Sequence, residues 1–311
     1  MAKVKIMSAE NTEAGHIDLP TQFSEEIRPD LISRSVLSIQ ASNRQPYGGY
    51  GDAGMRHSTK LSRRRRDYRG SYGMGISRVP RKIVSRRGRR MNWIGALAPG
   101  TVGGRRAHGP KPQSDWDQKV NTVENRKAIR SALAATMDKE IVTKRGHHVP
   151  ASFPFIVDNA FENLTKTTQV EAALVKLGFE KELERAGVTR ITAGRGKLRG
   201  RRYKTPTSFL FVVSGDATKL VKAAANMPGC DVVSVHRVNA ELLAPGTHVG
   251  RLTLYTKAAV ERLATEGLFT KAYKGPKVEK KAKAVKPVVE KKAPVKKAPA
   301  KKAAKKADKE E

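Results

Sequence analysis

The sequence of 311 residues has a single cysteine, Cys230, and no long apolar run. One cysteine excludes an internal disulfide and any metal site built from several cysteines. A membrane-spanning helix needs about 20 predominantly apolar residues, so no membrane partner is predicted. The first residues, Met1 to Met7, include lysines but no apolar stretch of signal-peptide length. We therefore expect a soluble, intracellular protein.

Signatures of catalysis are also missing. The sequence has no Gly-x-Ser-x-Gly motif and no phosphate-binding Gly-Lys-Ser/Thr loop. His147 and His148 have no third ligand at metal-site spacing, so a solvated or capping pair is the better interpretation. Acidic residues are scattered over predicted helix faces, where contact with solvent is the default. We predict no catalytic residue, no cofactor and no metal.

Acidic residues are outnumbered, and the basic excess is concentrated in two segments. The formal net charge is +33. Residues 43–118 hold 18 Lys and Arg against 4 Asp and Glu, and residues 271–311 hold 16 against 5, so these segments carry 25 of the 33 net charges. Clustered like charges repel one another unless a polyanion neutralises them, which makes nucleic acid the leading partner. An anionic membrane is the weaker alternative, because no segment pairs a basic face with a strongly apolar one.

Outside the two basic segments, short apolar runs alternate with amphipathic stretches. Strands are predicted at residues 3–7, 155–158, 209–213, 232–235 and 252–255. Helices are predicted at residues 28–42, 121–145, 168–177 and 216–226, and from a cap at Thr256. The alternation favours an α/β fold with a largely parallel sheet and flanking helices.

The two basic segments divide this fold. Residues 1–42 and 119–270 are predicted to form one globular domain, which is interrupted by an extended basic loop at residues 43–118. A loop of this length is either functional or disordered. Residues 271–311 repeat Lys, Ala and Pro and cannot build a core, so we expect a flexible, disordered basic tail.

The composition of the basic loop indicates RNA. Its 13 glycines and 5 prolines are too many for regular structure, and most of its cations are arginines. Arginine grips phosphate with a planar fork and stacks on bases, and aromatic rings offer further stacking surfaces for unpaired bases. These rings belong to Tyr47, Tyr50, Tyr68, Tyr72, Trp93 and Trp116. We expect the loop to thread between RNA helices and to become ordered there. The alternatives are a merely disordered insert, or a targeting signal at residues 63–66.

A second arginine-rich stretch lies inside the globular part, at residues 193–204, and we call it the basic clamp. Gly194 and Gly196 suggest a dinucleotide-binding fingerprint, but the third glycine position is occupied by Arg199 and the stretch precedes a strand. A clamp for phosphate groups is the better interpretation. Its predicted RNA-binding residues are Arg195, Lys197, Arg199, Arg201, Arg202 and Lys204.

Several stretches resemble a known family. They are "RPDLISRSV" from Arg28, "GRRAHGPK" from Gly104, "RSALAAT" from Arg130, "AGRGKLRGRRYK" from Ala193 and "ELLAPGTHVGRLT" from Glu241. In this order they resemble the large-subunit ribosomal protein four family in its archaeal–eukaryotic form, over roughly residues 1–270. The resemblance implies an α/β domain on the subunit surface and a long loop buried in ribosomal RNA. It also implies that the loop helps to form the wall and constriction of the nascent-peptide exit tunnel, together with the hairpin of a neighbouring ribosomal protein.

The resemblance places the tip of the basic loop near residues 78–98, because "SRVP" from Ser77 and "GRRAHGP" from Gly104 match its flanks. The loop residues expected to bind RNA are Arg63, Arg64, Arg65, Arg66, Arg69, Arg78, Arg81, Lys82, Arg86, Arg87, Arg89, Arg90, Arg105 and Arg106. Those expected near the tunnel are Arg89, Arg90, Met91, Trp93 and Ile94.

The resemblance thus implies a non-enzymatic constituent of the cytoplasmic large ribosomal subunit that binds its RNA and neighbouring ribosomal proteins and supports assembly and translation. Two alternatives come from other classes. The Lys/Ala/Pro tail suggests a chromatin-type DNA-condensing protein, although such a protein has little use for the stacking aromatics of the loop. An α/β core suggests an RNA-modifying enzyme, although the glycine fingerprint and an acid–base cluster are missing.

Overall fold

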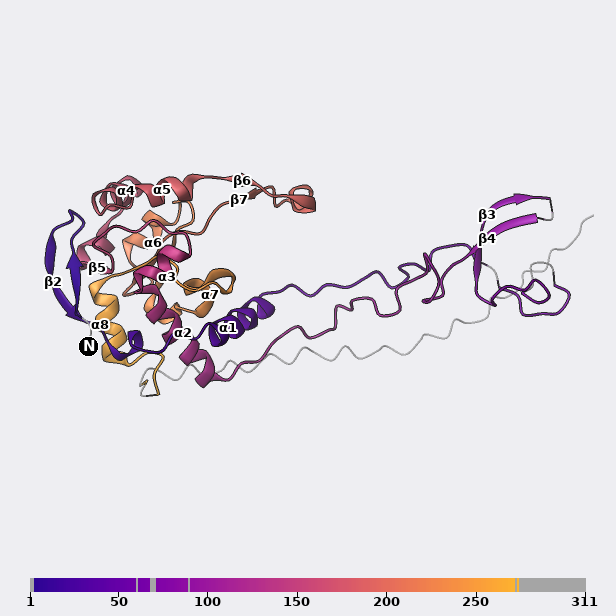
Figure 1. Ribbon diagram of the computed structural model, residues 1–311, viewed down its shortest axis with the longest axis horizontal. Coiled ribbons are helices and arrows are strands. Elements are labelled where there is room, and N and C mark those ends of the chain that lie inside the picture. Colours follow the sequence, from indigo (N-terminus) through magenta and orange to yellow (C-terminus); the bar gives the residue numbers. More distant parts are fainter. Residues whose placement is uncertain (1–2, 60, 68–70, 89, 272, 274–311) are drawn as a thin grey trace, which may run out of the picture. The chain divides into compact units, whose positions relative to one another are not determined.

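The computed structural model describes residues 3–59, 61–67, 71–88, 90–271 and 273 (Figure 1). The chain divides into two units, Met1–Lys274 and Gly275–Glu311. The second unit, and with it nearly all of the predicted basic tail, lies outside the described residues. The domain boundaries predicted within the first unit stay a prediction.

Two small three-stranded sheets form the centre of the globular part. In one, the order is β2-β1-β5, with β1 parallel to β5 and antiparallel to β2; in the other it is β10-β8-β9, and all pairs are parallel. A single parallel bridge between Val157 and Thr256 links them. The strands are β1 (Lys3–Met7), β2 (Glu13–Asp18), β5 (Phe155–Val157), β8 (Leu210–Val213), β9 (Asp231–Ser234) and β10 (Thr253–Tyr255). The predicted α/β class is confirmed. The prediction of one largely parallel sheet is confirmed only in part, because the strands form two small sheets and β2 is antiparallel to β1.

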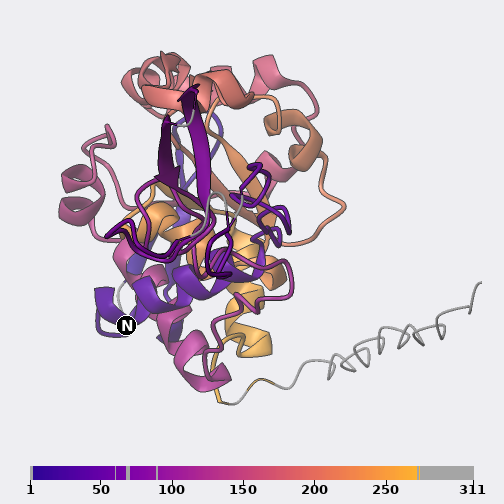
Figure 2. The same cartoon turned by 90° about the vertical axis from the view of Figure 1, so that its right-hand side faces the viewer.

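Helices cover both faces of these sheets (Figures 1 and 2). Successive strand residues alternate between two hydrophobic clusters: Leu210 and Val212 belong to one, and Phe211 and Val213 to the other. The first cluster includes residues of α1 (Pro29–Ser42), α2 (Thr122–Thr136), α7 (Ala240–Leu243) and α8 (Lys257–Glu266), and the second residues of α4 (Thr167–Lys176) and α6 (Lys219–Ala224). Strands buried on both faces explain the continuous apolar runs of the sequence.

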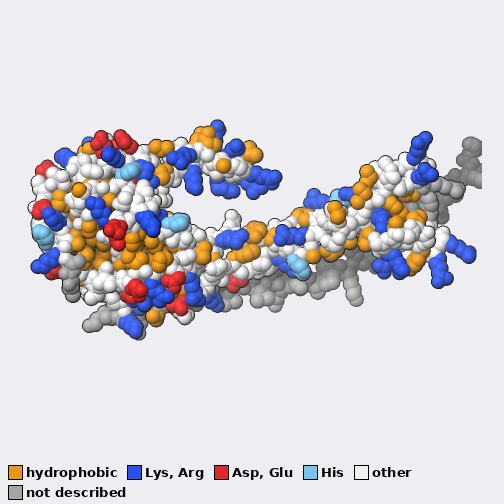
Figure 3. Space-filling model, in the orientation of Figure 1, with side chains coloured by type: hydrophobic (Ala, Val, Ile, Leu, Met, Phe, Trp, Pro, Cys, Tyr) orange, Lys and Arg blue, Asp and Glu red, His pale blue; other side chains and the backbone are white. Residues whose placement is uncertain are grey.

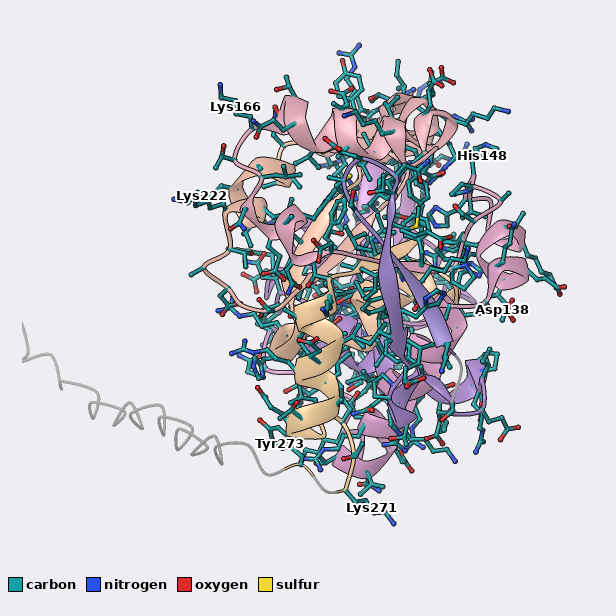
Figure 4. All side chains as sticks on the ribbon, turned by 90° about the vertical axis from the view of Figure 1, so that its left-hand side faces the viewer. Asp138, His148, Lys166, Lys222, Lys271 and Tyr273 are labelled. Atoms are coloured by element: carbon teal, nitrogen blue, oxygen red, sulfur yellow. The ribbon has the colours of Figure 1, made fainter. Side chains whose placement is uncertain are left out.

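The long helix predicted at residues 121–145 is interrupted. α2 ends at Thr136, and α3 (Lys139–Lys144) begins after Asp138, which lies at the junction (Figure 4). Asp138 has an extended backbone, and its carboxylate accepts a hydrogen bond from the Glu140 N–H at 2.9 Å. An aspartate in this position satisfies free N–H groups of a new first turn. The apolar stripe continues across the junction, which is why periodicity alone predicted one helix.

Other helix boundaries follow their predicted signals to different degrees. Thr256 caps α8 as expected, since its hydroxyl accepts from the Ala259 N–H. The helix predicted at residues 168–177, with Thr168 expected to cap it, begins earlier: α4 starts at Thr167, and Lys166 takes the cap position, so the expected cap is wrong. Short 3-10 turns connect these elements: η1 (Thr21–Phe23), η2 (Asn159–Asn163), η4 (Val235–Arg237) and η5 (Pro245–Thr247).

The basic loop contains regular structure that its composition did not predict. β3 (Arg81–Arg87) and β4 (Arg90–Gly95) form an antiparallel hairpin. Nearer the globular part, the outgoing and returning segments lie side by side: the Gly49 N–H donates to the Pro110 carbonyl at 2.9 Å, and a Cβ on Gly48 would lie only 2.3 Å from Cδ of Pro112. Glycine permits this approach because it has no side chain.

Candidate RNA-binding surfaces

The basic clamp is the tip of a hairpin inserted between α5 (Glu180–Gly187) and β8. β6 (Arg190–Ile191) pairs antiparallel with β7 (Tyr203–Lys204), and the 3-10 turn η3 (Gly194–Arg199) lies between them. Its six basic side chains are exposed, and Lys and Arg gather on this hairpin in the space-filling view (Figure 3). Within the described part of the chain none of them pairs with a carboxylate. Their charge is therefore available to phosphate groups.

The hairpin of the basic loop concentrates positive charge in another way. Arg87 lies directly opposite Arg90 across the two strands, and Arg81 and Lys82 stand at the other end of β3. Like charges opposite one another destabilise a strand pair, so an anion at this end of the hairpin would stabilise it. Of the residues predicted to bind RNA here, Arg69 and Arg89 lie outside the described residues.

Each described aromatic side chain of the loop has an arginine over its ring, an arrangement that composition alone did not reveal. The Tyr47 and Trp116 rings stack with centroids 5.3 Å apart, and the Arg44 guanidinium lies 4.4 Å from the Trp116 centroid. Similar pairs are Arg56 with Tyr50, Arg78 with Tyr72, and Arg81 with Trp93. Guanidinium groups and aromatic rings that lie together in this way both offer surfaces on which bases can stack.

The remaining predicted loop residues are distributed along it. Arg63 to Arg66 are exposed, and Arg105 and Arg106 line a pocket of about 430 Å³ together with Tyr50 and Lys111. Met91 and Trp93 are half-buried on β4, whereas Ile94 is 51% exposed. The predicted residues that the structure describes thus form two surfaces, one on the basic clamp and one along the basic loop.

A buried carboxylate lies at the base of the basic clamp, and its role was not predicted. The Glu182 side chain is fully buried. It accepts hydrogen bonds from Arg185 Nε at 2.9 Å, Ser208 Oγ at 2.8 Å, the His148 backbone N–H at 3.0 Å and His147 Nδ1 at 2.8 Å. Because an ionised carboxylate only accepts, the His147 proton sits on Nδ1.

The two neighbouring histidines, His147 and His148, have different environments. His147 is buried against Glu182, so its interpretation as a solvated or capping residue is wrong, whereas His148 is exposed (Figure 4). Among the described residues no group of three His, Cys, Asp or Glu side chains could hold a metal ion. In that same part of the chain, no helix has the length and apolarity to cross a bilayer.

Acid is expected to destabilise the protein through this cluster. Burial would raise the pKa of Glu182, but hydrogen bonds from Arg185, His147, His148 and Ser208 outweigh burial and hold it at about 2, below the ordinary 4.5. Burial lowers the pKa of His147, against its hydrogen bond with Glu182. Both groups bind protons more readily in the unfolded chain, so stability falls as the pH falls. The share of Glu182, about 3 kcal/mol, should be lost between roughly pH 4.5 and pH 2.

The measurement is the free energy of unfolding in urea at a series of pH values. Glu182→Gln should be less stable than the parent at pH 7, because the variant leaves buried donors without their charged acceptor. It should also lose less stability than the parent as the pH falls below about 4.5. Equal pH dependence in parent and variant would show that Glu182 does not titrate in this way.

Together, the fold and the two surfaces define a class: a basic α/β protein whose two arginine-rich hairpins suit a polyanion. The Ribosomal protein L4/L1 family matches residues 17–266, and the chain belongs to this family. Membership in this family of ribosomal structural proteins confirms that the chain is not an enzyme.

Its relatives include three archaeal proteins named large ribosomal subunit protein uL4. That of Nanoarchaeum equitans is 45% identical over 267 residues, covering 86% of this chain and 99% of the relative. That of Methanococcoides burtonii is 43% identical and covers 86% and 100%, and that of Archaeoglobus fulgidus is 43% identical and covers 84% and 98%. The resemblance drawn from the quoted stretches is thereby confirmed.

Proposed function

We propose that the chain is a structural constituent of the large ribosomal subunit in the cytoplasm and binds the RNA of that subunit. The observation that supports this proposal most strongly is the basic clamp. Its six cations are exposed and have no carboxylate partner among the described residues, and the chain belongs to a ribosomal protein family. Such cations bind phosphate and release counterions. The relatives are named as proteins of the large ribosomal subunit, which favours ribosomal RNA over other polyanions.

The basic loop is proposed to penetrate that RNA. Its arginine–aromatic pairs suit unpaired bases, and its β3–β4 hairpin carries Arg81, Lys82, Arg86, Arg87 and Arg90 for phosphates. With Met91, Trp93 and Ile94, this hairpin would contribute to the wall and constriction of the nascent-peptide exit tunnel, beside the hairpin of a neighbouring ribosomal protein. The globular domain of residues 1–42 and 119–270 would dock on the RNA surface, and the basic tail would add non-specific attraction to phosphate.

Sedimentation tests this function. Tagged protein, expressed in the cells from which the sequence comes, should sediment with large subunits and stay bound in a high-salt wash. High salt weakens contacts between surface charges, but it does not release a loop that is enclosed by folded RNA. A DNA-condensing protein would instead dissociate at high salt and would bind duplex DNA as well as ribosomal RNA. Release from the subunits in high salt would overturn the proposal.

A further inference from the structure

The basic clamp is held to the globular part by its two stems. The outgoing stem leaves the end of α5, and the returning stem passes Thr207 and Ser208 into β8. Arg185 Nη2 donates to the Thr207 carbonyl at 2.8 Å and to Glu182 Oε1 at 2.6 Å, and Ser208 Oγ donates to the same Oε1. Both stems therefore meet at one carboxylate.

The same carboxylate also joins these stems to the body of the protein. His147 and His148 follow α3, and both donate to Glu182. Beyond the stems the hairpin has little that could fix it, because every residue of β6 and β7 is exposed and η3 has no buried residue. Three separate segments thus donate hydrogen bonds to one buried carboxylate. Such a cluster is rigid, because each lost hydrogen bond leaves a buried polar group unsatisfied.

We infer that Glu182 and Arg185 are positioning residues for the basic clamp: they hold its two stems so that the clamp cations meet one RNA surface together. The inference rests on the proposed RNA-binding function. A mobile hairpin would keep its charges but would have to be ordered at each binding event, and that ordering weakens binding. Pre-organisation of this kind comes from supporting residues behind the contacting ones.

The experiment measures binding of the full chain to a fragment of large-subunit ribosomal RNA across a range of KCl concentrations. Glu182→Gln and Arg185→Lys should each weaken binding about five- to thirtyfold, and the slope of log K against log salt should stay unchanged because no phosphate contact is removed. Glu182→Gln adds one net positive charge, so an effect of charge alone would strengthen binding. Arg185→Lys keeps the charge and loses the planar fork that bridges Glu182 and Thr207.

Two controls separate positioning from general damage to the fold. Glu184→Gln makes the same chemical change on an exposed position of α5 and should bind like the parent. In a background that carries Arg199→Ala, Arg201→Ala and Arg202→Ala, adding Glu182→Gln should weaken binding clearly less than it does in the parent, because a residue that acts only through the clamp then positions only half of its six cations. If Glu182→Gln fails to fold at the assay temperature, Arg185→Lys carries the test.

Three outcomes would overturn the inference: binding by both variants like that of Glu184→Gln, a reduced salt slope, or a loss of affinity on adding Glu182→Gln that is as large in the triple-alanine background as in the parent. The proposed function fails separately, if the parent protein and the triple-alanine variant bind the RNA fragment equally.

Discussion

Replacing Arg199, Arg201 and Arg202 with alanine is expected to lower the affinity for large-subunit ribosomal RNA and to flatten its dependence on salt. Each lost phosphate contact should reduce the slope of log K against log salt by roughly 0.7 to 0.9, so three contacts should reduce it by roughly 2 to 2.7. The loss of affinity should then be roughly a hundredfold at about 0.1 M salt and should become small near 1 M.

The matched control removes equal charge from another surface. Lys166, Lys176 and Lys181 are exposed on and around α4 and α5, and none of them belongs to the clamp hairpin. Their triple alanine variant should change the slope by far less than the clamp variant, because long-range effects of exposed charges are screened beyond about 10 Å at 0.1 M salt. Equal slopes for both triple variants would mean that net charge matters and that the clamp has no particular role.

The elements that the sequence predicted best are those whose residues are apolar on both faces. Residues 209–213 read as a strand because each side chain is apolar, and β8 is buried along its whole length between two clusters. Thr256 was recognised as a cap because its signal is local and has one physical explanation. Where burial or a cap decides the structure within a few residues, the sequence suffices.

The elements that it missed depend on partners far along the chain. β2 is an edge strand with little buried surface, and its pairing with β1 is fixed by backbone hydrogen bonds that leave no apolar pattern. Glu182 looked like one more acidic residue on a solvated helix face. Its partners His147 and Ser208 lie 35 and 26 residues away in sequence. No periodicity connects such positions, so the support of the basic clamp emerges only in three dimensions.

The β3–β4 hairpin shows a third kind of limit. Averaged over residues 43–118, glycine and proline indicated irregular structure, yet residues 81–95 contain only two glycines and no proline. The pairing of Arg81 with Gly95 and of Arg87 with Arg90 defines a compact unit whose ends are joined, since the Ala96 N–H donates to the Pro80 carbonyl at 2.8 Å. The tip of the loop is thus one excisable element.

Removing residues 81–98 is expected to leave the protein able to enter large subunits and to alter the passage of nascent chains. The excision removes both strands of the hairpin together, and Val79 on one flank lines the same pocket as Gly100 and Thr101 on the other, so the shortened loop can close without disturbing its paired stem at Gly49 and Pro110. The basic clamp and the arginine–aromatic pairs at Tyr47 and Tyr50 remain. The binding that they supply should be sufficient for assembly.

The measurement compares subunit occupancy of the shortened protein with crosslinking of nascent chains to the tunnel wall. In a second variant, Arg86, Arg87 and Arg90 are changed to alanine, which keeps the hairpin and removes part of its charge. Comparing the two variants distinguishes the steric effect of the tip from the effect of its charge. If the tip contributes bulk at a constriction, the deletion should change crosslinking severalfold and the charge variant much less. Loss of incorporation would make the hairpin a primary anchor, whereas unchanged crosslinking in both variants would place it away from the tunnel. Because the globular part carries the proposed phosphate-binding clamp, we expect docking to precede the ordering of the loop, with counterion release offsetting the entropy that this ordering costs.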